Sequence, residues 1–245
     1  MGKGRVNKRP VTEVRAEMRD GYDASPFNPV PPVVWLVLLP IVAMEIVLSA
    51  GNLGFAGGAG AVGWRADALQ RFALSPLMLD EMVKTGRWNS DYAMRFLTYG
   101  FVHANLLHAL FVSVFILALG KMVAEIFRPW AFLAVFFGAA LSGALVYSAV
   151  PGVRAALIGG YPAAYGLIGA FTFVIWARLG AENAHRGRAF SLIGMLMGIQ
   201  LLFGLLFGGS PDWIADLAGF VTGFGLSFFV APGGPSHLLA RLRQR

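Results

Sequence analysis

Cysteine is absent from the 245-residue chain, and charged residues account for only 13% of it. Without cysteine, disulfides and thiol chemistry are excluded, and the redox compartment is left undefined. Soluble domains contain about 25% charged residues, so roughly half that share is typical of a chain embedded in a membrane. The hydrophobic content of 57% and the mean hydropathy of +0.64 are also typical of such a chain. The composition therefore predicts an all-α polytopic membrane protein.

The net charge of +7 does not by itself indicate a nucleic-acid partner. The basic residues stand at the ends of apolar segments and in the two tails, and no patch interleaves basic with aromatic residues. Membrane lipids with anionic headgroups are therefore the expected partners, and no nucleic acid is expected. The first thirty or so residues are polar, which is not the pattern of a signal peptide.

Six apolar runs are long enough to cross a bilayer, which takes about 20 residues. They cover residues 33–53, 100–124, 130–150, 158–177, 189–208 and 213–231. We expect one six-helix membrane domain over residues 33–231, with an N-terminal tail (1–32) and a basic C-terminal tail (232–245).

Lysine and arginine are distributed unequally between the two sides of these spans. Fourteen lie in the tails and in the loops on the same side, and six lie on the opposite side. Because basic residues concentrate on the cytosolic side of a membrane, both termini are expected in the cytosol. We expect an integral, multi-pass protein of a bacterial inner membrane.

The loop between the first two spans, residues 55–99, is longer than a helical hairpin requires. It contains an amphipathic stretch, RADALQRFALSPLMLDEMVKTGRW, at residues 65–88. Such a segment beside a membrane typically lies in the interface. The alternative is a gate or a binding flap.

The stretch GGYPAAYGLIGA predicts a helix that begins near Pro162, because proline suits the first turn of a helix. From Pro162 to Ala177 the run has 16 residues, or about 24 Å, against a hydrocarbon core of about 30 Å. This short span would start below the membrane surface. Irregular chain at that depth survives only inside protein or beside a wet cavity, so Tyr161 is predicted to face a cavity.

Two histidines and two acids fall within the predicted spans. His103 and His108 would lie about 140° apart around a helix. Two histidines that bind one metal are usually three or four residues apart. We therefore expect no metal, and no other cofactor. Asp216 stands one turn inside the last span. It is expected either to be a functional acid or to cap the helix N-terminus. Glu45 is a second acid within a span, and the sequence assigns it no partner.

Three motifs resemble those of the rhomboid family of intramembrane serine proteases, in the expected order and spans. RFLTYGFVHANLLHALF is similar to the family's WR-x-x-T-x-x-F-x-H-x-x-x-x-H-x-x-x-N signature. GGYPAAYGLIGA is similar to G-x-S-G-x-x-(Y/F)-x-x-x-G, and DLAGFVTG to H-x-x-G-x-x-x-G. The resemblance covers about residues 33–231 and implies a six-helix rhomboid-like bundle.

The resemblance also implies that the catalytic residues are replaced. Family members use a serine at the mouth of the fourth span, a histidine base from the sixth, and a histidine and an asparagine of the second span for the oxyanion. The serine position is Tyr161, the base position is Asp216, and the asparagine position is Val112, while His103 and His108 match. The tryptophan of the first motif is Met94, and Arg95 is retained. The motif positions left for helix packing are Gly159, Tyr165, Gly169, Gly219 and Gly223.

These replacements predict a pseudoprotease, a protein that binds transmembrane segments of client proteins without cutting them. Its polar pocket would comprise His103, His108, Tyr161, Tyr165 and Asp216. We hypothesise that the Tyr161 hydroxyl donates a hydrogen bond to the Asp216 carboxylate and closes the former site. The alternatives are a divergent intramembrane serine endopeptidase and, from the acids Glu45 and Asp216, a small-solute transporter or channel.

Overall fold

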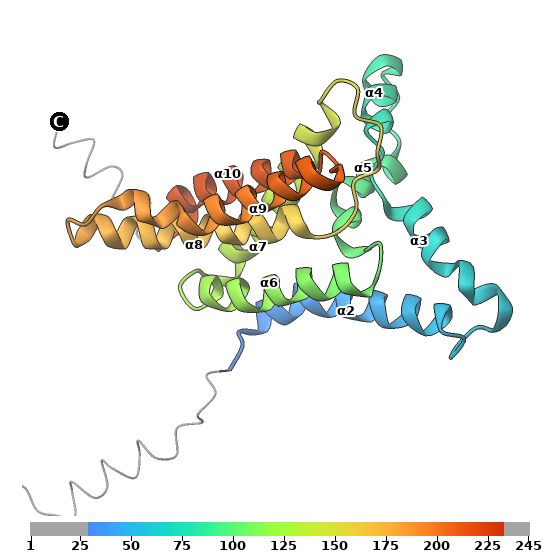
Figure 1. Cartoon of the computed structure of the whole chain (residues 1–245), viewed down its shortest axis with the longest axis horizontal. Helices are drawn as coiled ribbons and strands as arrows, with labels where there is room; N and C mark the ends of the chain where they lie inside the picture. Colours follow the sequence, from blue (N-terminus) through green and yellow to red (C-terminus); the bar gives the residue numbers. More distant parts are fainter. Residues whose placement is uncertain (1–28, 233–245) are drawn as a thin grey trace, which may run out of the picture. The chain divides into compact units, whose positions relative to one another are not determined.

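The computed structural model describes residues 29–232, and every element named below lies in the compact unit that begins at Pro31. Within this range six helices are long and apolar enough to cross a membrane. They are α2 (Pro32–Asn52), α6 (Leu106–Ala124), α7 (Pro129–Ser148), α8 (Tyr161–Ala181), α9 (Ser191–Phe207) and α10 (Trp213–Val230) (Figure 1). The predicted all-α class and its six spans are confirmed. The predicted tails lie almost wholly outside the described residues.

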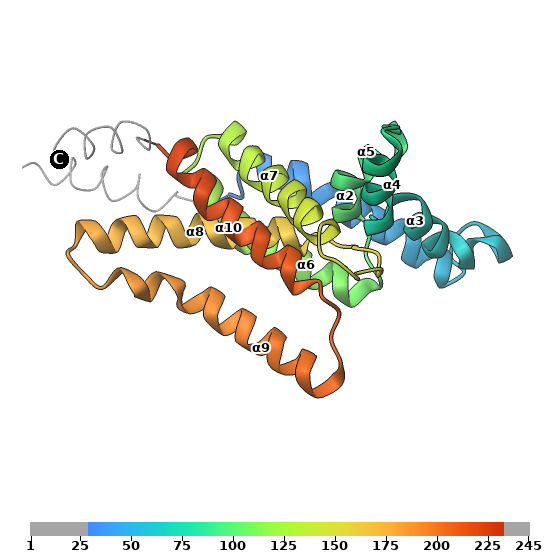
Figure 2. The same ribbon diagram turned by 90° about the horizontal axis from the view of Figure 1, so that it is seen from above.

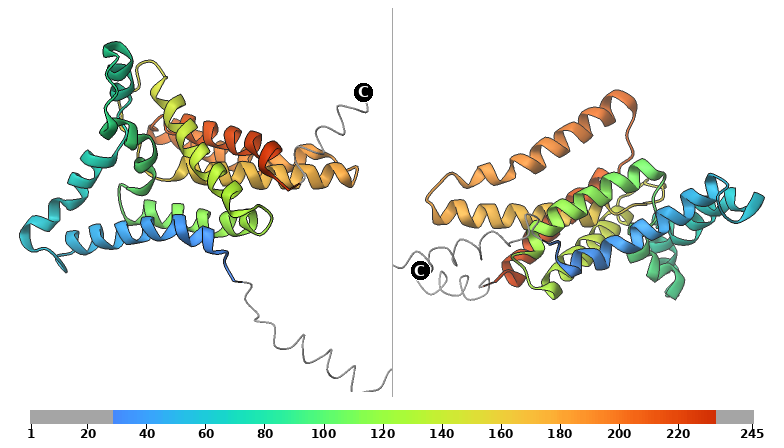
Figure 3. Two further views of the ribbon diagram at one scale, coloured as in Figure 1. Left: turned by 180° about the vertical axis from the view of Figure 1, so that it is seen from behind. Right: turned by 90° about the horizontal axis from the view of Figure 1, so that it is seen from below.

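Short helices form the long loop between α2 and α6. They are the 3₁₀ helix η1 (Gly58–Gly63), α3 (Trp64–Phe72), α4 (Pro76–Thr85), α5 (Ser90–Thr98) and the 3₁₀ turn η2 (Tyr99–Phe101). A further 3₁₀ helix, η3 (Arg186–Phe190), leads into α9. All of the first-loop elements lie at one end of the membrane helices (Figures 1 and 3).

The loop is packed into the protein rather than forming one continuous amphipathic segment. Leu74 separates α3 from α4 because its backbone exchanges two hydrogen bonds with Leu157, at 3.0 and 2.8 Å. Met82 of α4 is fully buried in a cluster with Leu74 and with Tyr147 of α7. Trp88, beyond the end of α4, stays 73% exposed. The hydrogen bonds between Leu74 and Leu157 thus join the segment just before α8 directly to the first loop.

The second span begins later than the sequence predicts. The chain turns through η2 and becomes extended at Val102, and α6 starts only at Leu106, where the Asn105 side chain accepts the His108 N–H at 2.9 Å. Because this cap sets the helix start, His103 stands before the helix. The predicted separation of about 140° around one helix is therefore wrong, and the His103 and His108 rings meet edge to face with centroids 5.0 Å apart.

The fourth span is not short. It begins at Tyr161 with Pro162 in its first turn, as predicted, but continues to Ala181, which gives 21 residues or about 32 Å. The helix extends past the apolar run because backbone hydrogen bonds do not require apolar side chains. Arg178 and Glu182 also pair one turn apart at its end, at 2.9 Å.

Helix α8 occupies the centre of the bundle and contacts α6, α7 and α10, while α2 packs against α6 (Figures 1 and 3). Gly219 and Gly223 of α10 lie against the Pro162 and Gly166 carbonyls of α8, and Gly169 of α8 lies against the Phe220 carbonyl. A side chain at any of the three glycines would overlap backbone. These residues therefore allow the close approach that substitutes for hydrophobic attraction between membrane helices.

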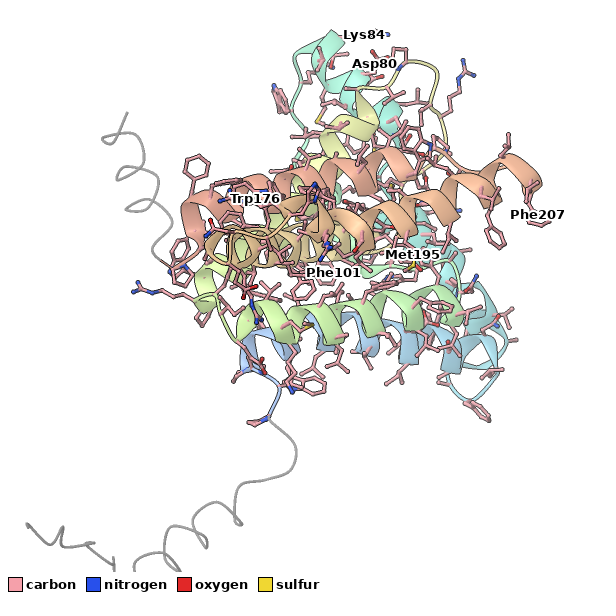
Figure 4. The ribbon with its side chains drawn as sticks, turned by 60° about the vertical axis from the view of Figure 1, so that its left-hand side comes forward. Asp80, Lys84, Phe101, Trp176, Met195 and Phe207 are labelled. Atoms are coloured by element: carbon pink, nitrogen blue, oxygen red, sulfur yellow. The ribbon has the colours of Figure 1, made fainter. Side chains whose placement is uncertain are left out.

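Helix α9 is the least packed of the six. Its single buried residue is Ile193, and along much of its length it runs apart from α8 and α10 (Figure 2). Met195 and Phe207 are exposed and project from it (Figure 4). This helix therefore presents most of its surface to lipid or to a partner.

A buried ion pair connects α2 with the first loop. Arg65 of α3 donates to both carboxylate oxygens of Glu45, at 2.6 and 3.0 Å, and Ser49 donates to the same carboxylate at 2.6 Å. The structure thereby supplies the partner of Glu45 that the sequence did not. Arg65 also donates to the His103 carbonyl at 2.9 Å.

The same network extends to the mouth of α8. The His103 ring is 1% exposed, and its Nε2 accepts the backbone N–H of Gly160 at 3.3 Å. Burial lowers the pKa of His103 to about 4, reinforced by His108 and Arg65 and opposed by Glu45. His103 is therefore neutral at pH 7, as an acceptor must be.

Replacing Glu45 by alanine should lower stability by about 3 kcal/mol, because the Arg65 guanidinium would remain in a partly buried position without its counter-ion. The measurement is the thermal unfolding midpoint in detergent. Asp80→Ala is the matched control, because Asp80 and Lys84 of α4 form an ion pair of the same length, 2.6 Å, on the exposed surface (Figure 4). Equal effects of the two substitutions would contradict a structural role for Glu45.

Acid should destabilise the protein through His103. Because its pKa in the folded chain is about 4 rather than 6.5, the unfolded chain binds a proton that the folded chain does not. This contribution is fully present above pH 6.5 and decreases by roughly 3 kcal/mol as the pH falls towards 4. His103→Gln keeps an acceptor without the titration, so the difference between its unfolding midpoint and that of the wild type should change with pH over this window. A constant difference would count against the assignment.

Candidate functional site

A cavity of about 330 Å³ lies where the first turns of α6, α8 and α10 come together. These helix ends lie at the same end of the bundle as the first loop (Figure 1). The cavity is lined by Asn105, His108, Leu157, Ile158, Tyr161, Pro162, Gln200, Asp212 and Asp216. It brings together three of the predicted pocket residues, His108, Tyr161 and Asp216. The two others, His103 and Tyr165, are not part of the lining. The His103 ring contacts the His108 ring, and the Tyr165 ring contacts the Tyr161 ring.

The ring of Tyr161 lies at the N-terminus of α8. The ring stacks on His108, with centroids 5.1 Å apart and an interplanar angle of 19°, and meets Phe115 and Tyr165 edge-on. The predicted position at a cavity is observed, and aromatic contacts hold the side chain there. Within the described residues, no hydrogen bond joins its hydroxyl to another side chain.

Asp216 has a partner different from the hypothesised one. Its carboxylate, on α10, accepts a hydrogen bond from Gln200 Nε2 of α9 at 3.0 Å, and the Tyr165 hydroxyl donates to Gln200 Oε1 at 3.3 Å. Asp216 is 2% exposed, so this bond gives a nearly buried carboxylate a hydrogen-bond partner within the protein. The hypothesised bond from Tyr161 is wrong, because the Tyr161 ring is stacked on His108 instead.

Gln200 is a site residue that sequence reasoning missed. It is the only amide in the otherwise apolar α9, and an isolated polar residue in a membrane helix usually bonds to a neighbouring helix. That signal was available, but it did not indicate which helix would provide the partner.

The remaining motif residues line or support the cavity. Gly159 has a φ of +88°, and a Cβ there would come within 2.6 Å of the His108 ring, so only glycine fits. Val112, at the asparagine position, is fully buried against Gly160. His108 Nε2 is buried and has no hydrogen-bond partner among the described residues. Val112 thus places an apolar side chain where the resemblance implies an oxyanion-binding amide.

None of the residues lining the cavity is a serine, threonine or cysteine. Catalysis of the serine-protease type requires such a group within hydrogen-bond reach of a base. Ser142 and Ser227 donate to backbone carbonyls of Ala139 and Gly223 instead. Within the described residues, no group of three His, Cys, Asp or Glu side chains could hold a metal ion.

One serine close to the cavity was also missed by the sequence reasoning. Ser210, in the exposed segment before α10, donates to Asp212 Oδ1 at 2.6 Å, and Asp212 lines the cavity. Its partner is a carboxylate and not an imidazole. This arrangement lacks the histidine that passes the proton to a leaving group in serine hydrolases.

Comparison with known proteins identifies the scaffold. The family model of the rhomboid domain matches residues 90–233, more than half of the chain. A rhomboid-like protease 3 from Toxoplasma gondii is 31% identical over 135 residues, which cover 54% of this chain and 49% of that protein. The chain thus spans about half the length of this relative. Together with the six membrane helices, these matches show that this integral, multi-pass membrane protein belongs to the rhomboid family.

Proposed function

We propose that this protein is a non-cleaving rhomboid, which binds transmembrane segments of client proteins. The observation that carries the proposal is the replacement of both members of the catalytic pair. Tyr161, at the serine position, is stacked on His108, and Asp216, at the histidine position, accepts a hydrogen bond from Gln200. Each side chain has a packing or hydrogen-bonding role that competes with nucleophile and base chemistry.

The route of a client into the site is provided by α9. This helix has one buried residue, and its Gln200 amide bonds to both α8 and α10. A client helix that displaced α9 would meet the Asp216 carboxylate and the Tyr165 hydroxyl. Polar or helix-breaking client segments would be favoured, because they offer backbone and side-chain groups to these atoms in an environment without water.

The proposed topology places both termini in the cytosol, from the excess of basic residues on that side. The first loop and the cavity would then face the opposite side of the membrane, which we take to be a bacterial inner membrane.

The two other candidate functions have less support. A divergent endopeptidase would need a nucleophile with a proton acceptor, and Ser210, which is bonded to a residue of the cavity lining, has only the Asp212 carboxylate. A transporter or channel would need its intramembrane acids along one path. Glu45 is held by Arg65 and Ser49 and does not line the cavity that contains Asp216.

A serine-directed fluorophosphonate should not label the purified protein, because no serine among residues 29–232 forms a hydrogen bond with an imidazole. The measurement is mass spectrometry of the full chain in detergent and in lipid nanodiscs, with the heat-denatured chain as control. Labelling at Ser210 that is abolished by Ser210→Ala would overturn the proposal in favour of the endopeptidase.

A model single-span peptide with a central Gly–Asn–Gly should bind more tightly than the same peptide with three central leucines. We expect about a tenfold difference in Kd, from one or two hydrogen bonds to the pocket. Asp216→Leu should abolish this preference, measured by fluorescence energy transfer in nanodiscs. Leu205→Ala, an exposed position on α9, is the control and should retain it. Equal affinity of the wild type for both peptides would contradict the proposed client recognition.

A further inference from the structure

We propose that a second cavity, between α2, α3 and α5, binds the headgroup of an ethanolamine phospholipid. This cavity has a volume of about 870 Å³ and shares no residue with the cavity at the mouth of α8. Pockets for small ligands commonly measure about 300–1,000 Å³. The proposal concerns a site distinct from the proposed client pocket and does not depend on the proposed function.

Four charged side chains line the cavity, two of each sign. They are Asp67 and Arg71 of α3 and Asp91 and Arg95 of α5. In the part of the chain that the structure describes, none of the four takes part in an ion pair. A cavity with two unpaired cations and two unpaired anions is matched by a ligand that carries both charges.

Arg95 is held in place before any ligand arrives. Its Nη1 donates to the backbone carbonyls of Gln70 and Ala73, at 2.8 and 3.3 Å. Two backbone acceptors fix the plane of the guanidinium group but leave its charge without a counter-ion. A planar guanidinium is well suited to a phosphate, because it donates two parallel hydrogen bonds to two phosphate oxygens.

The position of the cavity argues for a lipid. Val47 and Leu48 line it, and they lie about one helical turn before α2 ends at Asn52. The end of a membrane span lies at the level of the lipid headgroups. Trp64 also lines the cavity, and tryptophan is enriched at this level. Because Val47 is 52% exposed, an acyl chain could continue along α2 into the hydrocarbon region.

The two signs of charge select the type of headgroup. The phosphate would accept hydrogen bonds from Arg71 and Arg95, and the primary ammonium of ethanolamine would donate to Asp67 and Asp91. A glycerol headgroup supplies no cation for the two carboxylates. A choline headgroup supplies a cation that donates no hydrogen bonds.

The test is native mass spectrometry of the delipidated full chain, titrated with dioleoyl phosphatidylethanolamine, phosphatidylglycerol or phosphatidylcholine. We expect the ethanolamine lipid to bind about tenfold more tightly than the other two. Arg71→Gln and Asp91→Asn should each weaken its binding by about threefold. Both positions are exposed and their side chains donate or accept no hydrogen bond within the described residues, so the variants should fold. Asp67→Asn tests the second of the two carboxylates in the same way.

The matched controls are Asp80→Asn and Lys84→Gln, on α4 of the same loop but outside the cavity. They should leave lipid affinity unchanged. Equal affinities for the three lipids, or equal losses in the control variants, would overturn the proposal. Displacement of the lipid by an equimolar amount of soluble phosphoethanolamine would also overturn it, since the ligand would then be a soluble molecule recognised by the same chemistry.

Discussion

A polar group inside a bilayer has no water to bond with, so the protein itself must supply its partner. Two polar networks meet this requirement here, and together they set the positions of the helices around the site. Glu45 binds Arg65, which reaches the His103 carbonyl, and the His103 ring accepts the Gly160 N–H at the start of α8. On the other side of α8, Gln200 joins Asp216 to Tyr165. The N-terminal part of α8 thus lies between a hydrogen-bond network from the first loop and a hydrogen-bond network from α9.

The positions at which the resemblance implies catalytic residues also fit into this arrangement, around the cavity of about 330 Å³. A tyrosine at the serine position brings a ring that stacks on His108, and a valine at the asparagine position fills the space beside Gly160. Changing one member of a catalytic unit already removes most of its activity. Here Tyr161 stacks on His108, Val112 lies against Gly160 and Asp216 accepts a hydrogen bond from Gln200, so each of the three side chains has a structural contact of its own.

Local sequence signals predicted the helices, because length and apolar content are properties of a continuous segment. Pro162 correctly indicated where α8 begins. The start of α6 was predicted too early, since the Asn105 cap outweighs the apolar character of residues 100–105. The partners of the acids could not be predicted: Arg65 is 20 residues from Glu45, and Gln200 belongs to a different helix from Asp216. Such pairings depend on how helices pack, which hydropathy does not encode.

The glycine contacts between α8 and α10 limit which part of the bundle can move. Because Gly219 and Gly223 lie directly against carbonyls of α8, these two helices cannot slide or rotate against each other without overlap, whereas α9 has only one buried residue. Two interhelical hydrogen bonds of about 0.6 kcal/mol each give the arrangement with Gln200 engaged roughly an eightfold preference over one in which it is released. With one buried residue and these two hydrogen bonds, α9 is the membrane helix whose displacement costs the bundle the least free energy.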